Sequence, residues 1–371
     1  MEDVPGDRVV LRHPRPADVD DLVAVVDDPL VRRFVPALPV PYTRADAERW
    51  VTETVPAAWA AGDAWFAVTE PGDGRLVGQV GVFGASAYDV ASTGYLIGAA
   101  YRGRGLATAA VRAVTDWAFG HGVARLELET DVDNVASQHV AHAAGYRREC
   151  VRRGAGARRD GGRRDLVAFA RLAGDPAGPV ARLLPDLPCG ELSDGVVTLR
   201  PLVADDTASL HRLSGLPDVV ATRVPPEAMS EEEARGRCTS AVADWIAGDL
   251  AQLAIRDASS GEFLGEISLH YQAPRLGQAM LGYAMLPEHR RRGHVGRAID
   301  LVAGWAFDSV GIVRVTAGTH AGNAASQRTL ERAGFSREGV QRHLLPNADG
   351  TRTDNVMFVR LRTDRRQLTS S

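Results

Sequence analysis

Lysine is missing from this sequence: the 371-residue chain contains none, so all 43 of its Lys and Arg residues are arginines. Codon usage in a GC-rich genome is one explanation. Another is that a chain without lysine has no side-chain amines that it can modify itself. Both explanations fit the composition, and neither identifies a fold.

Cysteine is also scarce. Cys150, Cys189 and Cys238 are far apart, and none belongs to a C-x-x-C pair. Three scattered cysteines do not have the spacing of a zinc ribbon or of a disulfide framework. We therefore expect the protein to be located in a reducing cytoplasm.

Long apolar runs and a strong excess of positive charge are missing as well. No apolar stretch approaches the roughly 18 residues that span a bilayer, and the acidic start Met1-Glu2-Asp3 does not resemble a signal peptide. The net charge of −4 argues against general nucleic-acid binding, which needs a basic surface. We expect neither a membrane nor a nucleic-acid partner.

The sequence does contain an internal repeat. Leu11-Arg12 recurs as Leu199-Arg200, 188 positions further on (199 − 11), and Trp117-Ala118-Phe119 recurs as Trp305-Ala306-Phe307 at the same offset. From residue 134 the offset is 189 (323 − 134). The added residue falls in a turn after a helix, where insertions are tolerated. We expect two copies of one domain, in agreement with roughly 150 residues per domain.

The segment between the copies is rich in proline and glycine, which is typical of a linker. We expect a first domain over residues 1–173, a linker over 174–190, a second domain over 191–364 and a polar tail over 365–371. The repeat imitates a homodimer within one chain, so we expect a monomer, and a homodimer remains an alternative.

Hydrophobic periodicity predicts the same elements in both copies. In the first copy we expect strands at 7–13, 64–69, 76–83, 93–97 and 124–130, and helices at 17–26, 43–60, 105–121 and 134–144. With two further strands the order is βααβββαβαββ. This order predicts an α/β fold with a mixed sheet in each copy.

A glycine-rich turn leads into the longest helix of each copy. The first turn of a helix has unpaired N–H groups and partial positive charge, and therefore binds anions such as a pyrophosphate. A glycine there lets phosphate oxygens approach the backbone closely. The candidate binding residues are Arg102, Gly103, Arg104, Gly105, Leu106 and Ala107, and Arg290, Arg291, Arg292, Gly293, His294 and Val295. The alternative is a plain turn with solvated arginines.

A Gly-x-Gly-x-x pattern also occurs in dinucleotide-binding folds, where it follows the first strand. Here it lies about 100 residues into the domain, and the second copy keeps one glycine only. This context argues against a nucleotide-dependent oxidoreductase.

These segments resemble the GNAT superfamily of N-acetyltransferases. The family signature at the long helix is Arg/Gln-x-x-Gly-x-Gly/Ala. Arg102-Gly-Arg-Gly105-Leu-Ala107 matches it fully, and Arg290-Arg-Arg-Gly293-His-Val295 matches except at Val295. The segments Asp-Asn134-Val-Ala-Ser137 and Gly-Asn323-Ala-Ala-Ser326 resemble the subgroup that acetylates ribosomal-protein N-termini. The resemblance covers nearly all of both copies and implies acetyl-CoA as the acyl donor.

The resemblance also implies a reaction, in which a neutral primary amine of a small molecule, or of a peptide or protein N-terminus, attacks the thioester directly through a tetrahedral intermediate. The strand before the turn would supply a backbone N–H to the oxyanion, and Ile97, Gly98, Met285 and Leu286 would contact the coenzyme. Asn134 and Asn323 would lie near its thiol arm, and Ser137 and Ser326 would donate a proton to the leaving sulfur. The alternative is local: asparagine is a good N-cap, and the serines are polar residues of a first helical turn.

The general base is less evident. Glu266 is a candidate in the second copy, although it is equally compatible with a solvated strand residue, and its counterpart Gln79 has no basic carboxylate. This absence leaves open a CoA-binding pseudoenzyme or scaffold in which one or both copies are catalytically inactive. The pair His139-x-x-His142 lies on a predicted helix without a third ligand, so we expect no metal.

The two copies differ near their ends. Residues 147–164 of the first copy contain eight arginines, and the second copy has far fewer charges there. Either they form a solvated loop, or they form a basic lip for the 3′-phosphate of CoA or for an acidic substrate. We expect both copies to bind CoA, and the first to bind it more tightly because its signature is complete.

Overall fold

The computed structural model describes residues 2–72, 74–248 and 250–364. The chain divides into two compact units, residues 1–181 and residues 182–371, here called the first and the second unit. The division falls within the proline-rich segment between the two copies. Val180 N–H donates to the His142 carbonyl within the first unit, whereas Leu184 is fully buried in the core of the second. Both units therefore use residues of this segment.

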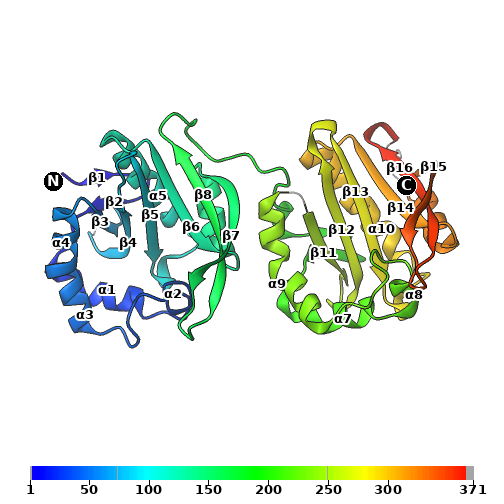
Figure 1. Ribbon diagram of the computed structural model, residues 1–371, viewed down its shortest axis with the longest axis horizontal. Helices are drawn as coiled ribbons and strands as arrows, with labels where there is room; N and C mark the ends of the chain where they lie inside the picture. Colours follow the sequence, from blue (N-terminus) through cyan, green and yellow to red (C-terminus); the bar gives the residue numbers. More distant parts are fainter. Residues whose placement is uncertain (1, 73, 249, 365–371) are drawn as a thin grey trace. The chain divides into compact units, whose positions relative to one another are not determined.

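The first unit follows the expected order of elements (Figure 1). Its strands are β1 (Val4–Pro5), β2 (Val10–Arg12), β3 (Ala64–Thr69), β4 (Leu76–Phe83), β5 (Val90–Ile97), β6 (Arg125–Asp131), β7 (Arg147–Ala157) and β8 (Arg163–Leu172). Its helices are α1 (Val19–Val26), α2 (Pro29–Phe34), α3 (Arg44–Arg49), α4 (Val55–Ala60), α5 (Leu106–Gly120) and α6 (Val135–Ala143).

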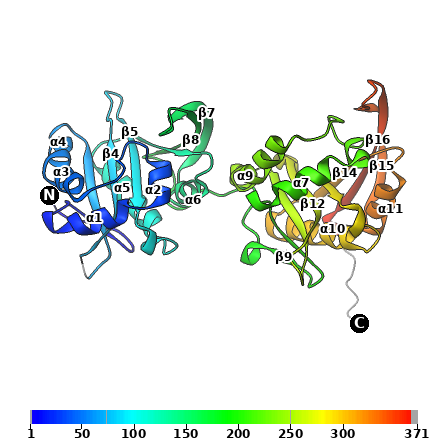
Figure 2. The same cartoon turned by 90° about the horizontal axis from the view of Figure 1, so that it is seen from below.

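The second unit repeats this order. Its strands are β9 (Leu192–Ser193), β10 (Val197–Pro201), β11 (Leu250–Asp257), β12 (Phe263–Ala273), β13 (Gln278–Met285), β14 (Arg314–His320), β15 (Ser336–Pro346) and β16 (Arg352–Leu361). Its helices are α7 (Thr207–Ser214), α8 (Pro217–Val220), α9 (Glu231–Ala247), α10 (His294–Trp305) and α11 (Ala324–Arg332). The hairpin of β15 and β16 projects from the body of this unit (Figure 2).

Each unit contains one eight-stranded mixed sheet within the described residues. The strand order is β1-β2-β3-β4-β5-β6-β8-β7 in the first unit, and the second has the equivalent order β9-β10-β11-β12-β13-β14-β16-β15. Neighbouring strands are antiparallel except β5 with β6 and β13 with β14, which are parallel. The predicted α/β fold with two tandem copies is confirmed.

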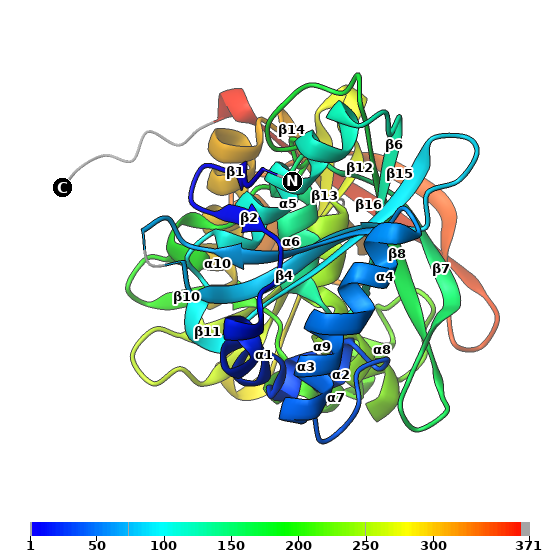
Figure 3. The ribbon, with the colours of Figure 1, turned by 90° about the vertical axis from the view of Figure 1, so that its left-hand side faces the viewer.

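Helices cover both faces of each sheet. In the first unit, α5 and α6 bury Val111, Val114 and Ala141 against one face. On the other face, α1 and α3 bury Leu22 and Ala47 against Ala67 and Leu76 of the sheet. Figure 3 shows α1, α2 and α3 gathered on one side of β4. The apolar stripe predicted at 105–121 therefore faces the sheet, as a period of 3.6 requires.

The structure adds elements that periodicity did not predict. The helix α2 has six residues, too few for a periodic pattern, and depends on local capping: Asp28 accepts hydrogen bonds from the N–H groups of Leu30 and Val31. The helix expected over 43–60 is present as α3 and α4, joined by a π-helical turn at Trp50–Thr54. The strand expected at 93–97 begins three residues earlier, at Val90.

The parallel pair of strands in each sheet separates toward its carboxyl ends. β5 and β6 pair over Val90–Ser92 and Arg125–Glu127 only. Beyond that point, β5 stays bonded to β4 and β6 stays bonded to β8. The second unit has the same arrangement, because β13 and β14 pair over three residues only. We call this divergence the strand split, and the candidate site lies beside it.

Candidate active site

The turn before α5 has the conformation that an anion site needs. Gly105, the N-cap residue of α5, lies in the left-handed region with φ of +77°, and its counterpart Gly293 has φ of +81° before α10. Gly103 has φ of +74°, and a Cβ built on it would meet no atom within 4 Å. No side chain caps α5 at Gly105. The N–H groups of its first turn are therefore available to a ligand.

The second unit keeps this turn with a less suitable residue. Arg291 stands where the first unit has Gly103, and it adopts φ of +59°. A side chain in the left-handed region costs roughly 1–2 kcal/mol. The turn therefore keeps its shape in both units, at some local strain in the second.

Not all arginines of the two glycine-rich turns point outward. Arg102 donates from Nε to the Ile97 carbonyl, 3.1 Å away, and from Nη2 to Asp28, 2.8 Å away. This hydrogen bond from Arg102 lowers the pKa of the Asp28 carboxyl. Arg290 repeats the arrangement with the Met285 carbonyl and Asp218. These two arginines bind the turn to the end of the preceding strand.

The remaining predicted residues of the turns divide by burial. Arg104 is half exposed and pairs with Glu70 at 2.5 Å. Leu106 is buried, and Ala107 and Val295 pack against the cores of their units. Arg292 is exposed, and His294 is half buried. The backbone of these turns is thus better placed to receive an anion than most of their side chains.

The strand end offers one backbone donor to the strand split. Gly98 N–H donates to the Val77 carbonyl of β4 at 3.0 Å. Since successive N–H groups of an extended strand point to opposite sides, Ile97 N–H points toward the strand split. Leu286 N–H similarly donates to the Leu264 carbonyl, which directs Met285 N–H toward the split of the second unit.

A tyrosine and a serine meet beside the split in both units. The Tyr95 hydroxyl of β5 lies 3.0 Å from Ser137 Oγ of α6. The Tyr283 hydroxyl of β13 lies 2.9 Å from Ser326 Oγ of α11. Neither tyrosine is among the site residues predicted from the sequence, although the repeated Gly-Tyr pair at Gly94 and Gly282 marks both.

These tyrosines remain protonated at neutral pH. Burial raises the pKa of Tyr95 to about 12, and it also raises the pKa of Tyr283. A neutral phenol donates a hydrogen bond, so each pair has a proton available for a developing negative charge.

The two predicted asparagines, Asn134 and Asn323, have a structural role. Asn134 Oδ1 accepts from Ser137 N–H at 3.2 Å, and Asn323 Oδ1 accepts from Ser326 N–H at 3.0 Å. Each asparagine is therefore the N-cap of its helix. This cap fixes the serine in the first turn, where it contacts the tyrosine.

Glu266 is not brought together with Ser326. It pairs across β12 and β13 with Ala284, while its neighbour Ile267 pairs with Tyr283. Since side chains alternate along a strand, Glu266 and Tyr283 lie on opposite faces of the sheet. The carboxylate of Glu266 instead contacts Arg237 Nη2 of α9 at 2.8 Å.

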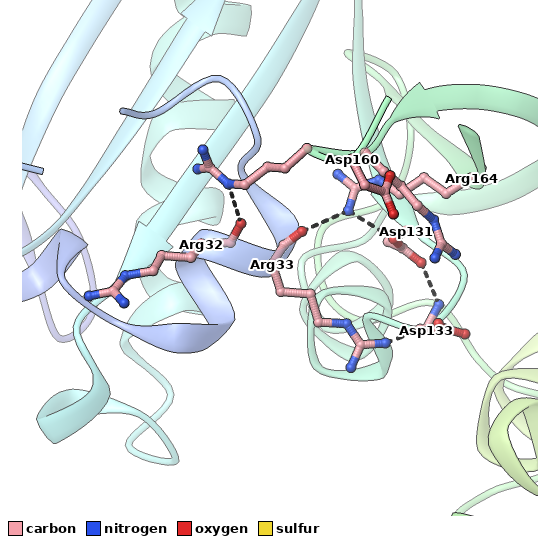
Figure 4. Close-up of a pocket in the computed structure, with 8 residues that line it drawn as sticks. Arg32, Arg33, Asp131, Asp133, Asp160 and Arg164 are labelled. Atoms are coloured by element: carbon pink, nitrogen blue, oxygen red, sulfur yellow. Dashed lines mark hydrogen bonds and ion pairs between the residues drawn. The ribbon is translucent and has the colours of Figure 1, made fainter. Parts of the chain in front are cut away.

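A charged pocket of about 260 Å³ lies in the first unit. Figure 4 shows Arg33 of α2 reaching Asp133, with Asp131 and Arg164 beside them. The lining residues come from α2, the end of β6 and the β7–β8 hairpin, and all are charged: Arg32, Arg33, Asp131, Asp133, Arg158, Arg159, Asp160 and Arg164.

Two of these arginines hold the end of α2. Arg159 donates to the carbonyls of Arg32, Val35 and Leu38. Arg164 donates to the carbonyls of Arg33 and Phe34. The last carbonyls of a helix have no partner within the helix, and cations stabilise that end. Part of the arginine cluster predicted to be a loop or a lip is therefore a helix cap.

The described residues contain no group of three His, Cys, Asp or Glu side chains that could hold a metal ion. No helix in the described part of the chain is long and apolar enough to cross a membrane.

Comparisons with known proteins identify the family. The model of the acetyltransferase (GNAT) domain matches residues 8–147 and again residues 197–336. The chain is 36% identical over 97 residues to the uncharacterized N-acetyltransferase YoaA of Bacillus subtilis (strain 168), which covers 26% of this chain and 54% of YoaA. It thus spans about half the length of that curated relative.

Solved structures align with about half of the chain. An acetyltransferase of the GNAT family from Bacillus anthracis is 18% identical with a TM-score of 0.42, covering 47% of this chain and 99% of its own. The ribosomal L7/L12 α-N-protein acetyltransferase RimL in complex with coenzyme A is 20% identical with a TM-score of 0.42, covering 46% and 96%. Because one family model matches both units and more than half of the sequence, the chain belongs to the GNAT acetyltransferase family.

Proposed function

We propose that the protein transfers an acetyl group from acetyl-CoA to a primary amine of a small molecule or a peptide. The observation that carries the proposal is the combination of an open helix N-terminus with the Tyr95–Ser137 pair across the strand split. The first offers amides to a diphosphate, and the second offers a proton donor to a thiolate. A location in the cytoplasm is part of the proposal, because all three cysteines are free.

The proposed reaction proceeds through a tetrahedral intermediate. The amine nitrogen attacks the thioester carbon, and Ile97 N–H stabilises the oxyanion. The C–S bond then breaks, and the thiolate takes a proton from Ser137, which in turn takes one from Tyr95. Water returns a proton to Tyr95, so the proton that the amine releases balances the proton on the free thiol. In this proposal the attacking amine loses its own proton to water. Met285, Ser326 and Tyr283 have these roles in the second unit.

We infer that both units bind the coenzyme and that the first binds it more tightly. Gly103 leaves open space at the turn, whereas Arg291 occupies the equivalent position in the second unit with a strained backbone. In the first unit, Ala107 is also smaller than its counterpart Val295.

The experiment has a binding arm and a turnover arm. Calorimetric titration of acetyl-CoA into the full chain should give two sites, and Gly105→Asp should remove the tighter one because a carboxylate repels the diphosphate. Gly293→Asp should remove the weaker one. Unchanged stoichiometry in the Gly105→Asp variant would contradict the ranking of the units.

The turnover arm measures free thiol released from acetyl-CoA with a panel of primary amines. We expect release that depends on both the amine and the enzyme. Two-site binding without release for any amine would mean that the protein binds the coenzyme without transferring its acetyl group.

A further inference from the structure

The charged pocket of the first unit contains no apolar lining residue. Five arginines oppose three aspartates, so the lining carries an excess of positive charge. A pocket of this kind does not favour an uncharged acceptor, because an apolar ligand would have to desolvate every wall. It favours a small ligand that itself carries charge.

The pocket lies at the same end of the sheet as the proposed reaction site. Asp131 ends β6 and Asp133 directly precedes Asn134, the N-cap residue of the helix that carries Ser137. The parallel strands β5 and β6 end at the same edge of the sheet, so the pocket and the Ile97 amide share that edge. A ligand in the pocket therefore lies on the side from which an amine can approach the strand split.

Most of the lining charges already have partners. Arg164 pairs with Asp131 at 3.0 Å, and Arg33 pairs with Asp133 at 3.0 Å. Arg159 is bonded to the carbonyls at the end of α2. Within the described part of the chain, the Arg158 guanidinium has neither a hydrogen-bond nor an ion-pair partner. Arg158 is therefore the cation that a ligand can use without breaking an existing contact.

The second unit lacks this set of charged residues. Its residues at the equivalent positions are mostly uncharged: Val220, Ala221, His320, Gly322, Asn347, Ala348, Asp349 and Thr353. Asn347 replaces Arg158, and its side chain contacts His320 and Thr351 instead. The two units share the turn and the Tyr–Ser pair, and they differ in the residues at the position of the charged pocket.

We propose that the acceptor amine of the first unit carries an anionic group, a carboxylate or a phosphate, which binds in the charged pocket through Arg158. This inference rests on the proposed acetyl transfer and adds the chemical class of the acceptor. The acceptor of the second unit does not need such a group.

The test uses three short amines that differ in one group: phosphoethanolamine, β-alanine and ethanolamine. Each is titrated into the full chain saturated with CoA, so that the coenzyme site is occupied, and each is then assayed for thiol release from acetyl-CoA. The variant Arg158→Asn copies the second unit. Arg153→Asn is the matched control, because Arg153 is an exposed arginine of β7 outside the pocket.

We expect at least one anionic amine to bind about 10-fold more tightly than ethanolamine, as for a hydrogen bond to a charged group. Arg158→Asn should remove this preference through KM, with kcat and CoA affinity unchanged, and Arg153→Asn should retain it. The preferred anionic amine identifies the group as carboxylate or phosphate.

Two results would overturn the inference: equal binding of the anionic and neutral amines to the wild-type chain, or a loss of CoA affinity in Arg158→Asn. The second would assign the pocket to the coenzyme. Selective binding of an anionic amine without thiol release would instead contradict the acetyl transfer and leave the anion site intact, so the two failures are distinguishable.

Discussion

The hydroxyl of Tyr95 donates a hydrogen bond to Ser137 Oγ at 3.0 Å, and so connects β5 to the first turn of α6 beside the strand split. The equivalent contact in the second unit is 2.9 Å long. The two units thus have the same pair of hydroxyls, although the residues of the charged pocket in the first unit are mostly uncharged in the second.

Removing the tyrosine hydroxyl should slow the reaction without weakening the binding of the coenzyme. In Tyr95→Phe we expect kcat to fall about 10- to 100-fold, at the lower end of the range for proton transfer by a positioned side chain. The KM for acetyl-CoA should stay constant, because the ring remains in place. Steady-state kinetics with Tyr283→Phe shows which unit supplies the turnover, and Tyr88→Phe is the control at an exposed tyrosine. Unchanged kcat in Tyr95→Phe combined with Tyr283→Phe would contradict the proton-donor role.

The core of the first unit contains a buried hydroxyl pair that allows a double-mutant cycle. The Tyr146 hydroxyl lies 2.6 Å from Thr115 Oγ1, which also donates to the Val111 carbonyl. The second unit has Phe335 and Ala303 at these positions. Thr115→Ala should destabilise the first unit by about 1–3 kcal/mol, because it leaves the buried Tyr146 hydroxyl without a hydrogen-bond partner. Tyr146→Phe should destabilise it by about 0.5–1.5 kcal/mol.

The double change reproduces the pair of the second unit and should cost less than the sum of the single changes. Urea unfolding, followed by a probe in the first unit, measures all four corners of the cycle. Strict additivity would show that the two hydroxyls do not depend on each other.

The ion pair between Asp28 and Arg102 predicts a dependence of stability on pH. Its hydrogen bond lowers the pKa of Asp28 below the ordinary value of about 3.9. Stabilisation by a depressed carboxyl pKa is present above that ordinary value and is lost as the pH falls through the folded-state pKa. Asp28→Asn should therefore lower the melting temperature at pH 7 and have less effect near pH 3. The exposed Asp7→Asn is the control, and an equal Asp28→Asn effect at both pH values would rule out this linkage.

Arg291, the strained residue in the turn of the second unit, gives a prediction in which a substitution stabilises the protein. Arg291→Gly relieves a left-handed conformation worth roughly 1–2 kcal/mol and adds about 0.5–1 kcal/mol of backbone entropy to the unfolded chain. We expect a small net stabilisation, up to about 1 kcal/mol. The converse change, Gly103→Arg, should destabilise the first unit. Thermal unfolding of both variants compares them, and a destabilised Arg291→Gly chain would disprove the strain.

The sequence predicted the features that depend on repetition and local pattern. The offset of 188 and the apolar stripes predict the duplication and the α/β order, and the glycines predict a turn before α5 that phosphate oxygens can approach, although not its left-handed conformation. The Tyr95–Ser137 contact was not predicted, because it joins residues 42 positions apart and depends on where α6 packs. Nor does a sequence alone show that Arg159 and Arg164 cap α2, since a six-residue helix without a periodic pattern cannot be foreseen.

The anchoring of the connecting segment has a practical consequence for dividing the protein. An isolated first half that stops at residue 173 would lack the hydrogen bond from Val180 to His142. A second half that starts at residue 191 would lack Leu184, Leu187 and the Pro185 carbonyl that accepts from Trp245. Deleting a buried leucine side chain costs about 2–5 kcal/mol. Half-length expression plasmids should therefore be cut between codons 181 and 182, where neither product loses part of its interior.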